Sequence, residues 1–517
     1  MTAIITDQFR LENANNFIKS IEDPSNSYYI FVGLSNPETV GFGRTNNWNT
    51  NTPNPVDNLE YQQHTRDTIL FGKRVNSANA RRVIRRIDWV RGTRYEMYRH
   101  DYSLNNLSPI TQSSRLYDAN YYVINSNYSV YICIDNGSSG INTVGNTSLD
   151  EPQFTDVDPS KAGVSEDGYI WKYLFTVSPS DIIKFDSTEY ISLPYNWENS
   201  VDSQVESVRE NGDSSVNLNQ IKKIYIQNGG SGYTPGTHEL NILGDGTGGK
   251  VVVEVDDETT TIISATVSSG GKDYSYAIVD LGPINATTLG TPAKLIPIIP
   301  PSKGHGYDPY KELGSDRVLL YTRFDDSTRD FPTDTKFSQI GVIKNPITIG
   351  STSVYTGGEF SSLYGIRFSS VSGVTNLSIG DEIIQSVGSG QARAYVASYD
   401  VETKVLKYYK DRSLYLNSST QDQTDYVGVS TNSLVLDFQS SASPVTSASG
   451  FNGTISGYTG ITTTIGSKLI NLGTQFTNGL ANPEINKTSG ELLYLDNRPL
   501  ISRNSRQKED IKIILEF

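Results

Sequence analysis

The chain has 517 residues, a formal net charge of -14 and a hydrophobic fraction of 36%. This length exceeds what one hydrophobic core usually serves, so we expect about two to four domains. The negative charge argues against nucleic-acid binding through a generally basic surface. No apolar run approaches the roughly 18 residues that a membrane-spanning helix needs, and the polar N-terminus predicts a protein that stays in the cell that makes it.

The side-chain composition favours strands and turns. Tyr numbers 32 and Gly 44, with abundant Ser, Thr and Asn, so we expect a mainly β fold. The single cysteine, Cys133, excludes an intrachain disulfide and a cysteine-rich zinc site, and its apolar neighbours predict a buried hydrophobe. With only 4 histidines, metal binding and acid–base catalysis are disfavoured.

The N-terminus contains the clearest helix signal. Thr6 or Asp7 can cap a helix whose apolar residues recur at helical spacing, and the pair Asp23-Pro24 stops it. This pattern predicts a small helical part ahead of the strands.

A strand, a long loop and a second helix are expected next. Residues 28–34 form an apolar run typical of a buried strand. The polar segment 35–56 is long enough to need a task, such as reaching a neighbouring subunit, and a second helix is predicted over 57–76. Short strands are then expected over 94–99, 121–124, 128–134, 169–177 and 189–193, with a short helix over 181–185.

Glycine-rich strands follow from about residue 218 to 300. The glycine pair Gly229-Gly230 and Tyr233 recur 41 residues later as a second glycine pair and Tyr274. A repeated unit of strand, glycine pair and tyrosine predicts a small all-β module with two related hairpins.

The remaining chain divides into three stretches. Residues 301–345 are again similar in composition to the first 200 residues, with two strong strand signals. A second glycine-, serine- and threonine-rich region spans about 350–480, and its polar part near 440–460 is expected to be a mobile loop. Two strands that flank a charged turn should close the chain, the last one tucked into a sheet.

No motif predicts an enzyme, a cofactor site or a metal site. The segment 244–249 (GDGTGG) matches a phosphate-binding loop in spacing, but a strand pattern follows it, so we expect a hairpin turn. The acidic residues within 245–258 lack the spacing of a calcium loop. His305 lies near Asp308 and Glu312 in sequence, and the adjacent glycines predict a tight turn there. We therefore assign no catalytic, cofactor-binding or metal-binding residue.

A basic cluster is the best interface candidate. Its members are Arg81, Arg82, Arg85, Arg86, Arg91 and Arg94, with Trp89 among them. Without an aromatic stacking platform, this cluster favours ion pairs within the fold, or docking onto an acidic partner, over nucleic-acid binding. The tyrosines suggest in addition a β surface that binds carbohydrate or protein.

Three sequence blocks resemble one known family. They are EDGYIWKYLFTVSPSD (166–181), SGELLYLDNRPLI (489–501) with the closing IKIILEF, and the opening helix with RRIDW (85–89) and FSQIGVIKNPI (337–347). These blocks are similar to the dimeric baseplate wedge protein of T-even-type contractile-tailed phages and their cyanophage relatives. The remaining stretches look like inserted β modules.

The resemblance implies a mainly β, multi-domain, sandwich-type architecture with a small helical N-terminal part. We expect a wedge region over 1–200, an inserted module over 201–304, a return to the wedge core over 305–348, a second inserted module with a Ser/Gly/Thr-rich loop over 349–484, and closing strands over 485–517. It also implies a non-enzymatic structural role in the virion tail baseplate, assembled in the host cytoplasm. The partners would be other wedge proteins and a second copy within each of six wedges, with no nucleic acid, membrane or small-molecule substrate.

The implied task is to join neighbouring wedge subunits and to help transmit the conformational change that triggers sheath contraction. The alternative is a receptor-binding or lectin-like tail protein whose inserted modules recognise host glycans. A polysaccharide-degrading tail enzyme would need many regular repeats, and two imperfect copies fit it poorly.

Overall fold

Antiparallel strands make up most of the chain, as expected: 43% of the residues are in strands and 12% in helices. The computed structural model describes residues 6–34, 48–211, 219–285, 290–325, 335–388, 390–410, 436–503 and 507–517. Unit 1 comprises Met1–Ile18, Arg81–Leu319 and Ile514–Phe517, and unit 2 comprises Lys19–Ala80 and Leu320–Ile513. Over these described ranges, no helix has both the length and the apolar character needed to cross a membrane.

The predicted N-terminal helix is confirmed as α1, Asp7–Glu22. The hydroxyl of Thr6 accepts a hydrogen bond from the amide of Phe9 at 3.3 Å, so Thr6 satisfies one of the amides that a helix start leaves free. The helix ends directly before the Asp23-Pro24 pair.

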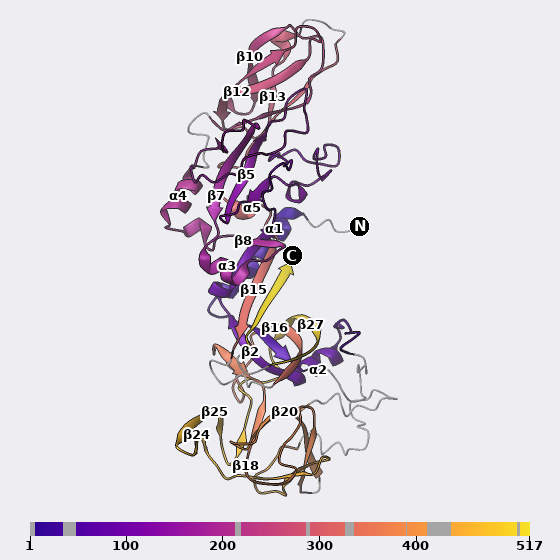
Figure 1. Cartoon of the computed structure of the whole chain (residues 1–517), viewed down its shortest axis with the longest axis vertical. Coiled ribbons are helices and arrows are strands. Elements are labelled where there is room, and N and C mark those ends of the chain that lie inside the picture. Colours follow the sequence, from indigo (N-terminus) through magenta and orange to yellow (C-terminus); the bar gives the residue numbers. More distant parts are fainter. Residues whose placement is uncertain are drawn as a thin grey trace. The chain divides into compact units, whose positions relative to one another are not determined.

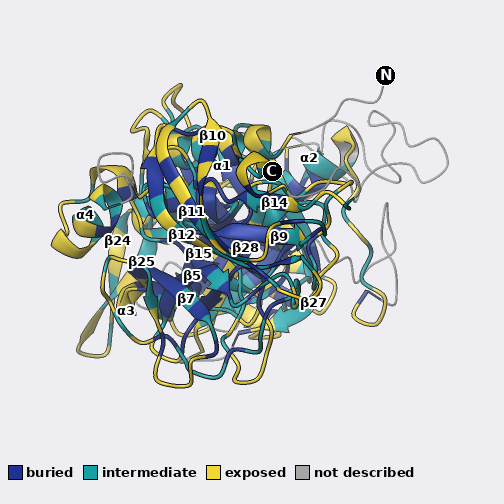
Figure 2. Cartoon of the chain, turned by 90° about the horizontal axis from the view of Figure 1, so that it is seen from above, coloured by how far each residue is buried: buried dark blue, intermediate teal, exposed yellow. Residues whose placement is uncertain are grey.

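The first core of unit 1 surrounds a sheet in the order β4-β5-β7-β6. The strands are β4 Tyr122–Ile124, β5 Ser129–Asn136, β6 Ser160–Lys161 and β7 Tyr169–Thr176, and the helices are α3 Pro179–Phe185, α4 Ser203–Glu210 and α5 Pro309–Glu312. Figure 2 shows β5 and β7 largely buried and α4 largely exposed. Trp171 at the centre is fully buried between tyrosines. These strands and α3, which Ser178 caps, confirm the predicted elements.

The strand predicted over 94–99 is wrong. The amide of Tyr95 donates to the hydroxyl of Tyr169 at 2.9 Å, and those of Glu96 and Tyr98 donate to two different neighbouring segments. The segment is buried and its backbone is satisfied, but no single partner strand runs alongside it.

The glycine-rich module consists of strands β9 to β14 and has a hydrophobic core of its own. Its strands are β9 Ile224–Asn228, β10 Gly236–Gly244, β11 Thr247–Val255, β12 Ile262–Lys272, β13 Ala277–Val279 and β14 Lys294–Pro297. The larger sheet has the order β12-β11-β10-β13, and β9 pairs with β14. Segment 244–249 connects β10 to the antiparallel β11, so the expected hairpin turn is confirmed. Whether the module is an insertion stays a prediction.

The two-copy repeat is visible in the folded module. The carbonyl of Gly229 accepts a hydrogen bond from Ile262, and the carbonyl of Gly270 accepts one from Ile221, both at 3.0 Å. Each glycine pair therefore contacts the isoleucine that begins the other copy. A Cβ at Gly229 or Gly270 would collide with the carbonyl oxygen of that same isoleucine, so only glycine fits.

Strand β9 serves two hydrophobic cores because its side chains alternate between two faces. Ile224 and Ile226 enter the module core, whereas Tyr225 between them belongs to the first core of unit 1. In the partner strand β14, Leu295 faces the module core and Ile296 packs against the first core. The module is thus attached through shared strands.

One sheet of unit 2 has the order β17-β2-β1-β16-β27. Its strands are β1 Tyr28–Gly33, β2 Ile69–Val75, β16 Lys336–Lys344, β17 Glu359–Ser361 and β27 Glu491–Ser502 (Figure 1). The helix predicted over 57–76 is only half right: α2 spans Leu59–Thr68, and β2 follows at once. Residues 69–75 are extended because β2 lies between β1 and β17, a pairing that no local pattern reveals.

The other sheet of unit 2 closes into a small barrel through the pairing of β18 with β21. Its strands are β18 Tyr364–Gly373, β19 Glu382–Val387, β20 Gly390–Asp400, β21 Val405–Tyr409, β22 Val445–Ser447, β23 Phe451–Ile455 and β26 Leu480–Ala481. A hairpin of β24 Gly460–Ile465 and β25 Lys468–Phe476 forms a separate sheet that packs against β21 and β26. The mobile loop expected near 440–460 is therefore wrong: β22 and β23 belong to the barrel, and Val445, Phe451 and Ile455 enter its core.

A further sheet has the order β28-β15-β3-β8, with β3 Ala80–Arg85, β8 Tyr190–Ser192, β15 Arg317–Phe324 and β28 Glu509–Glu516. Strands β27 and β28 confirm the two predicted closing strands. Of the long loop predicted over 35–56, residues 35–47 lie outside the described residues. Trp48 beyond them is buried within the chain and donates to the carbonyl of Arg498 at 2.8 Å.

Candidate interaction surface

The arginine cluster begins on β3, and its first member is committed to contacts within unit 1. Arg81 donates to both carboxylate oxygens of Asp181, at 3.2 and 3.0 Å. Its guanidinium also lies 5.1 Å from the ring of Phe185 and 5.0 Å from the ring of Tyr195. A paired and stacked arginine of this kind stabilises the fold more readily than it binds a partner.

Arg81 and Arg82 line two different cavities. Successive residues of a strand point to opposite faces, and the guanidinium of Arg82 lies 4.4 Å from the ring of Tyr310. The cavity there measures about 690 Å³ and is also lined by Glu12 of α1, Trp197 and Arg209. Acidic and basic groups balance around it, so its lining selects neither sign of charge.

The next two arginines are likewise engaged within unit 1. Arg85 donates through Nη2 to the carbonyl of Ala119 at 3.1 Å and to the side chain of Asn120 at 3.0 Å. Arg86 contacts Asp88 at 2.9 Å and Asp186 at 2.6 Å, and these carboxylates, chiefly that of Asp88, outweigh burial and raise the pKa of its guanidinium. Neither side chain is free to reach a partner without breaking these contacts.

The last two arginines stand on an exposed loop. Arg91 and Arg94 are exposed, and neither forms a hydrogen bond or ion pair with any residue that the structure describes. Between the two groups of arginines, Trp89 is half-buried and donates to the hydroxyl of Ser148 at 3.0 Å. Val90 on the same loop is 56% exposed.

A second exposed segment lies near this loop. The carboxylate of Asp150 accepts hydrogen bonds from the amides of Ser165 and Val164 at 2.7 and 2.8 Å. These bonds, chiefly those from Ser165, lower the pKa of Asp150, and the charge of Arg91 contributes. Val164 is 93% exposed. The loop around Arg91 therefore combines free arginines with exposed valines, whereas the rest of the predicted cluster is packed into the fold.

The His305 group is structural, as the flanking glycines suggest. His305 and Glu312 are both buried and hydrogen-bonded to each other, and Glu312 also accepts the amide of Gly306 at 2.7 Å. Asp308 caps α5 by accepting the amide of Lys311 at 3.2 Å. Both carboxylate oxygens of Glu312 are therefore engaged within the fold.

The acidic turn residues are likewise occupied by local hydrogen bonds. Asp245 accepts the amide of Ser275 at 2.9 Å, and hydrogen bonds from Ser275 lower its pKa to about 2. Asp256 accepts the amide of Thr259 at 2.8 Å. Across the described ranges, no group of three or more His, Cys, Asp or Glu side chains is placed to hold a metal ion.

Many of the tyrosines that suggested a binding surface are buried in the cores, so these side chains cannot form such a surface. Buried examples are Tyr95, Tyr98, Tyr121, Tyr122, Tyr131, Tyr169, Tyr173 and Tyr225. Burial raises the pKa of several of them, including Tyr121. Tyr95 packs edge-to-face and Tyr169 stacks on Trp171, while Tyr98 packs edge-to-face on Tyr121, and these contacts stabilise unit 1.

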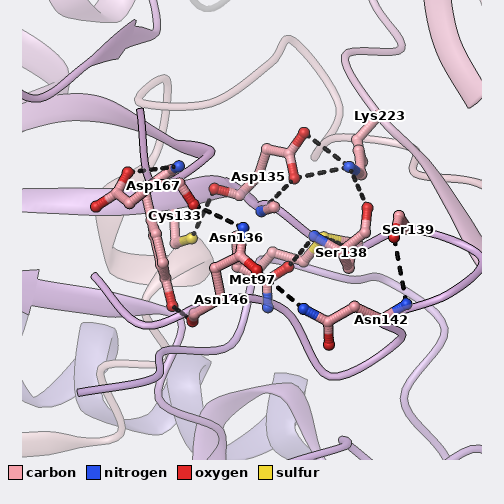
Figure 3. Close-up of polar contacts among 12 residues, drawn as sticks. Met97, Cys133, Asp135, Asn136, Ser138, Ser139, Asn142, Asn146, Asp167 and Lys223 are labelled. Carbon is pink, nitrogen blue, oxygen red and sulfur yellow. Dashed lines mark hydrogen bonds and ion pairs between the residues drawn. The ribbon is translucent and has the colours of Figure 1, made fainter. Parts of the chain in front are cut away.

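Sequence reasoning missed a buried ion pair at the base of the glycine-rich module (Figure 3). Lys223 is 9% exposed, contacts Asp135 of β5 at 2.7 Å and donates to the carbonyl of Ser138 at 3.0 Å. The sequence contained a signal for this contact: Lys223 directly precedes β9 and is two residues from Tyr225, so both side chains point away from the module core.

Further hydrogen bonds fix the loop beside this ion pair. The side-chain amide of Asn136 donates to the carbonyls of Tyr95 and Val144 at 3.1 and 3.2 Å. Asn146 donates to the carbonyl of Asp167 at 2.8 Å (Figure 3). These bonds fix the segment that follows β5, and Lys223 ties the module to that segment through Asp135 and Ser138.

Comparison with known proteins yields one distant similarity. No family model matches the chain. Baseplate wedge protein gp8 of Enterobacteria phage T4 is 27% identical over 221 residues, which cover 37% of this chain and 61% of that protein. The match therefore spans less than two thirds of the relative's length. It supports the coarse part of the predicted resemblance, while a cyanophage origin and inserted modules stay predictions.

Proposed function

We propose that this chain is a structural, non-enzymatic component of a phage tail baseplate, located in the virion and assembled in the host cytoplasm. The observation that carries the proposal is the 27% identity to a baseplate wedge protein over 37% of the chain. The three sequence blocks that resemble the same family point in the same direction. Other baseplate proteins are the partners that this role requires.

Within the baseplate, we assign the chain to the wedge. It would join neighbouring wedge subunits as a homodimer and help transmit the rearrangement that triggers sheath contraction. A subunit that transmits force needs stiff bodies, because a soft core would absorb the displacement. The aromatic core around Trp171 and the shared strand β9 give unit 1 this stiffness.

The exposed loop is our proposed contact with an acidic wedge partner. Arg91 and Arg94 form no ion pair or hydrogen bond with a described residue, and Val90 and Val164 supply apolar area beside Arg91. The double variant Arg91→Ala/Arg94→Ala should weaken wedge assembly about tenfold and leave folding unchanged. Equal assembly of the variant and the wild type would remove this loop from the interface.

Two measurements test the proposed wedge role: the mass of the isolated protein in solution and its assembly with other wedge proteins. At micromolar concentration, light scattering should give twice the chain mass of 57.0 kDa. Mixing with the other wedge proteins of the same phage should give a discrete larger complex. A sharp monomer mass that these proteins do not change would contradict the proposal.

Recognition of host glycans is the second candidate, and one cavity of unit 2 favours it. The cavity measures about 760 Å³, and its described lining includes aromatic residues such as Tyr364 and Phe438, the amides Gln475 and Asn482, and the carboxylates Asp437 and Glu484. Aromatic faces with a few amide and carboxylate groups suit sugar rings. A glycan array with the wild type and with Gln475→Ala tests it: specific binding that the variant loses supports this candidate, and an empty array contradicts it.

A further inference from the structure

We propose that the glycine-rich module carries a docking surface for a protein partner whose exposed apolar side chains are flanked by basic ones. The surface consists of Leu243, Tyr276 and Ile278, and we call it the apolar corner. The inference rests on the proposed structural role, since it names a partner contact for a subunit that works by assembly.

Two of the three side chains, Leu243 and Ile278, share the outer face of one sheet. Leu243 of β10 lies directly opposite Ile278 of β13, and the next pair in the register joins Ile242 to Val279. Ile242 and Val279 are buried in the module core, so Leu243 and Ile278 point outward. Tyr276 lies in the turn that leads into β13, two residues before Ile278, and is exposed as well. The exposed fractions are 46% for Leu243 and 62% for each of the other two.

The rest of this face is polar, as expected of an antiparallel sheet with one solvated side. Glu239 lies on the same face of β10, four residues before Leu243. It forms an ion pair with Lys250 at 3.0 Å and accepts a hydrogen bond from the hydroxyl of Ser268 at 3.1 Å. Glu254 accepts a hydroxyl from β12 at 3.3 Å. The apolar corner departs from this pattern, and adjoining exposed apolar side chains mark interaction sites.

Tyr276 is presented on an ordered turn. The carboxylate of Asp245 accepts its amide at 3.2 Å and the amide of Ser275 at 2.9 Å. The hydroxyl of Tyr276 makes no hydrogen bond to any residue in the described part of the chain. An exposed tyrosine on a fixed backbone loses little entropy on binding, and tyrosine is enriched among the residues that dominate interface energies.

Charge at the rim selects the occupant. Asp245 borders Tyr276, and Asp280 follows Ile278 by two residues on the same side of the chain. Hydrogen bonds from Ser275 hold the pKa of Asp245 at about 2, so its charge is present at neutral pH. Nucleic acid and anionic lipid would be repelled, and a second copy would bring like charges together. A basic protein segment complements this rim.

The small area of the apolar corner limits the affinity with which it can bind a partner. Stable interfaces bury about 800 Å² on each partner, whereas even a large aromatic side chain buries only about 150 to 250 Å². Three partly exposed side chains therefore make one contact of an assembly that is held at several places. An isolated peptide should bind with a Kd on the order of 0.1 to 1 mM, about 4 to 5.5 kcal/mol.

The test uses the full chain and two synthetic ten-residue peptides, one alternating Lys and Val and the other alternating Glu and Val. We expect the Lys/Val peptide to bind at least tenfold more tightly than the Glu/Val peptide. The triple variant Leu243→Thr/Tyr276→Ser/Ile278→Thr should lower Lys/Val affinity at least tenfold. The whole chain is acidic and would attract the Lys/Val peptide nonspecifically. The triple variant keeps this charge, so the affinity that it retains measures the nonspecific attraction. Val201→Thr, at a position 88% exposed outside the corner and outside the loop of Arg91, is the matched control and should bind like the wild type.

Four results would overturn the proposal: equal binding of both peptides, unchanged Lys/Val binding by the triple variant, binding to phosphatidylserine vesicles that the triple variant loses, or self-association that it loses. Circular dichroism of the variants checks that the module still folds. The proposed baseplate role fails separately, if the wild-type chain forms no complex with wedge proteins. A triple variant that assembles tenfold less well while keeping the wild-type dimer mass would support both.

Discussion

Replacing Lys172 by methionine should stabilise the protein at neutral pH and remove a rise in stability toward alkaline pH. Lys172 lies in β7 opposite Ile132 of β5 and is 3% exposed. Its ammonium donates to the carbonyl of Val157 at 2.6 Å and forms no ion pair with a described residue. Burial lowers the pKa of Lys172 from 10.5 to about 8.

The sign of the pH effect follows from this lowered pKa. Below pH 8 the lysine is charged in the folded and the unfolded chain, and the folded chain bears the full cost of the buried charge. Between pH 8 and 10.5 the folded chain has released its proton while the unfolded chain retains it, so the free energy of unfolding rises. At about 1.4 kcal/mol per pKa unit the whole effect is about 3 kcal/mol, of which about 2 kcal/mol is gained between pH 7 and 9.5.

Methionine is a suitable replacement because it fills a similar volume without a charge. The carbonyl of Val157 also accepts the side-chain amide of Asn211 at 2.8 Å, so it stays satisfied in the variant. Lys172→Met should therefore be more stable than the wild type by about 1 to 3 kcal/mol at pH 7, and this advantage should shrink by about 2 kcal/mol at pH 9.5.

The assay is urea unfolding followed by tryptophan fluorescence, since three of the 4 tryptophans belong to unit 1. Burial raises the pKa of Cys133 and of several tyrosines, which lowers stability at alkaline pH. These groups are common to both proteins, so the difference between variant and wild type isolates Lys172. The exposed Lys161→Met is the matched control and should show a constant difference. If Lys172→Met also differs from the wild type by a constant amount between pH 7 and 9.5, the reasoning is refuted.

Three further variants test the fold and the site. Lys223→Met removes the ion-pair partner of Asp135 and should lower the free energy of unfolding of the module by about 3 kcal/mol. This loss should appear as faster amide hydrogen exchange in strands β9 to β14, and unchanged exchange would contradict the anchoring role. Gly270→Ala should lower the thermal midpoint by several degrees, because its Cβ meets a backbone carbonyl, whereas Gly358→Ala, with nothing within 4 Å, should leave the midpoint unchanged; equal effects would refute the close-contact argument. Arg81→Ala should destabilise the chain by about 2 kcal/mol in urea unfolding, and Arg94→Ala by less than about 0.5 kcal/mol; similar losses would mean that the exposed loop is also structural.

Elements with local signals were predictable. The start of α1 at Thr6 and its end before Asp23-Pro24 follow from capping chemistry and proline sterics, which act within a few residues. Strands β5 and β7 carry apolar runs too dense for a surface element. Glycine pairs flanked by strands likewise marked the hairpins of the module.

Errors arose where distant parts of the chain decide the local conformation. Residues 69–75 become β2 because β1 and β17 lie on either side, and the run 94–99 stays irregular because its amides find separate acceptors. The arginines of the cluster are close in sequence, but the structure separates them into different environments. Arg81 and Arg82 are neighbours in β3 and line different cavities, while Arg91 and Arg94 are free on a loop.

The most direct test of the account is a density map of the tail that carries this chain, at a resolution that shows side chains. The account predicts two copies within each baseplate wedge, with the loop of Arg91 and Arg94 against an acidic neighbour and the apolar corner covered by a basic one. A chain found singly at the periphery, with sugar bound in the unit 2 cavity and both surfaces open to solvent, would contradict it.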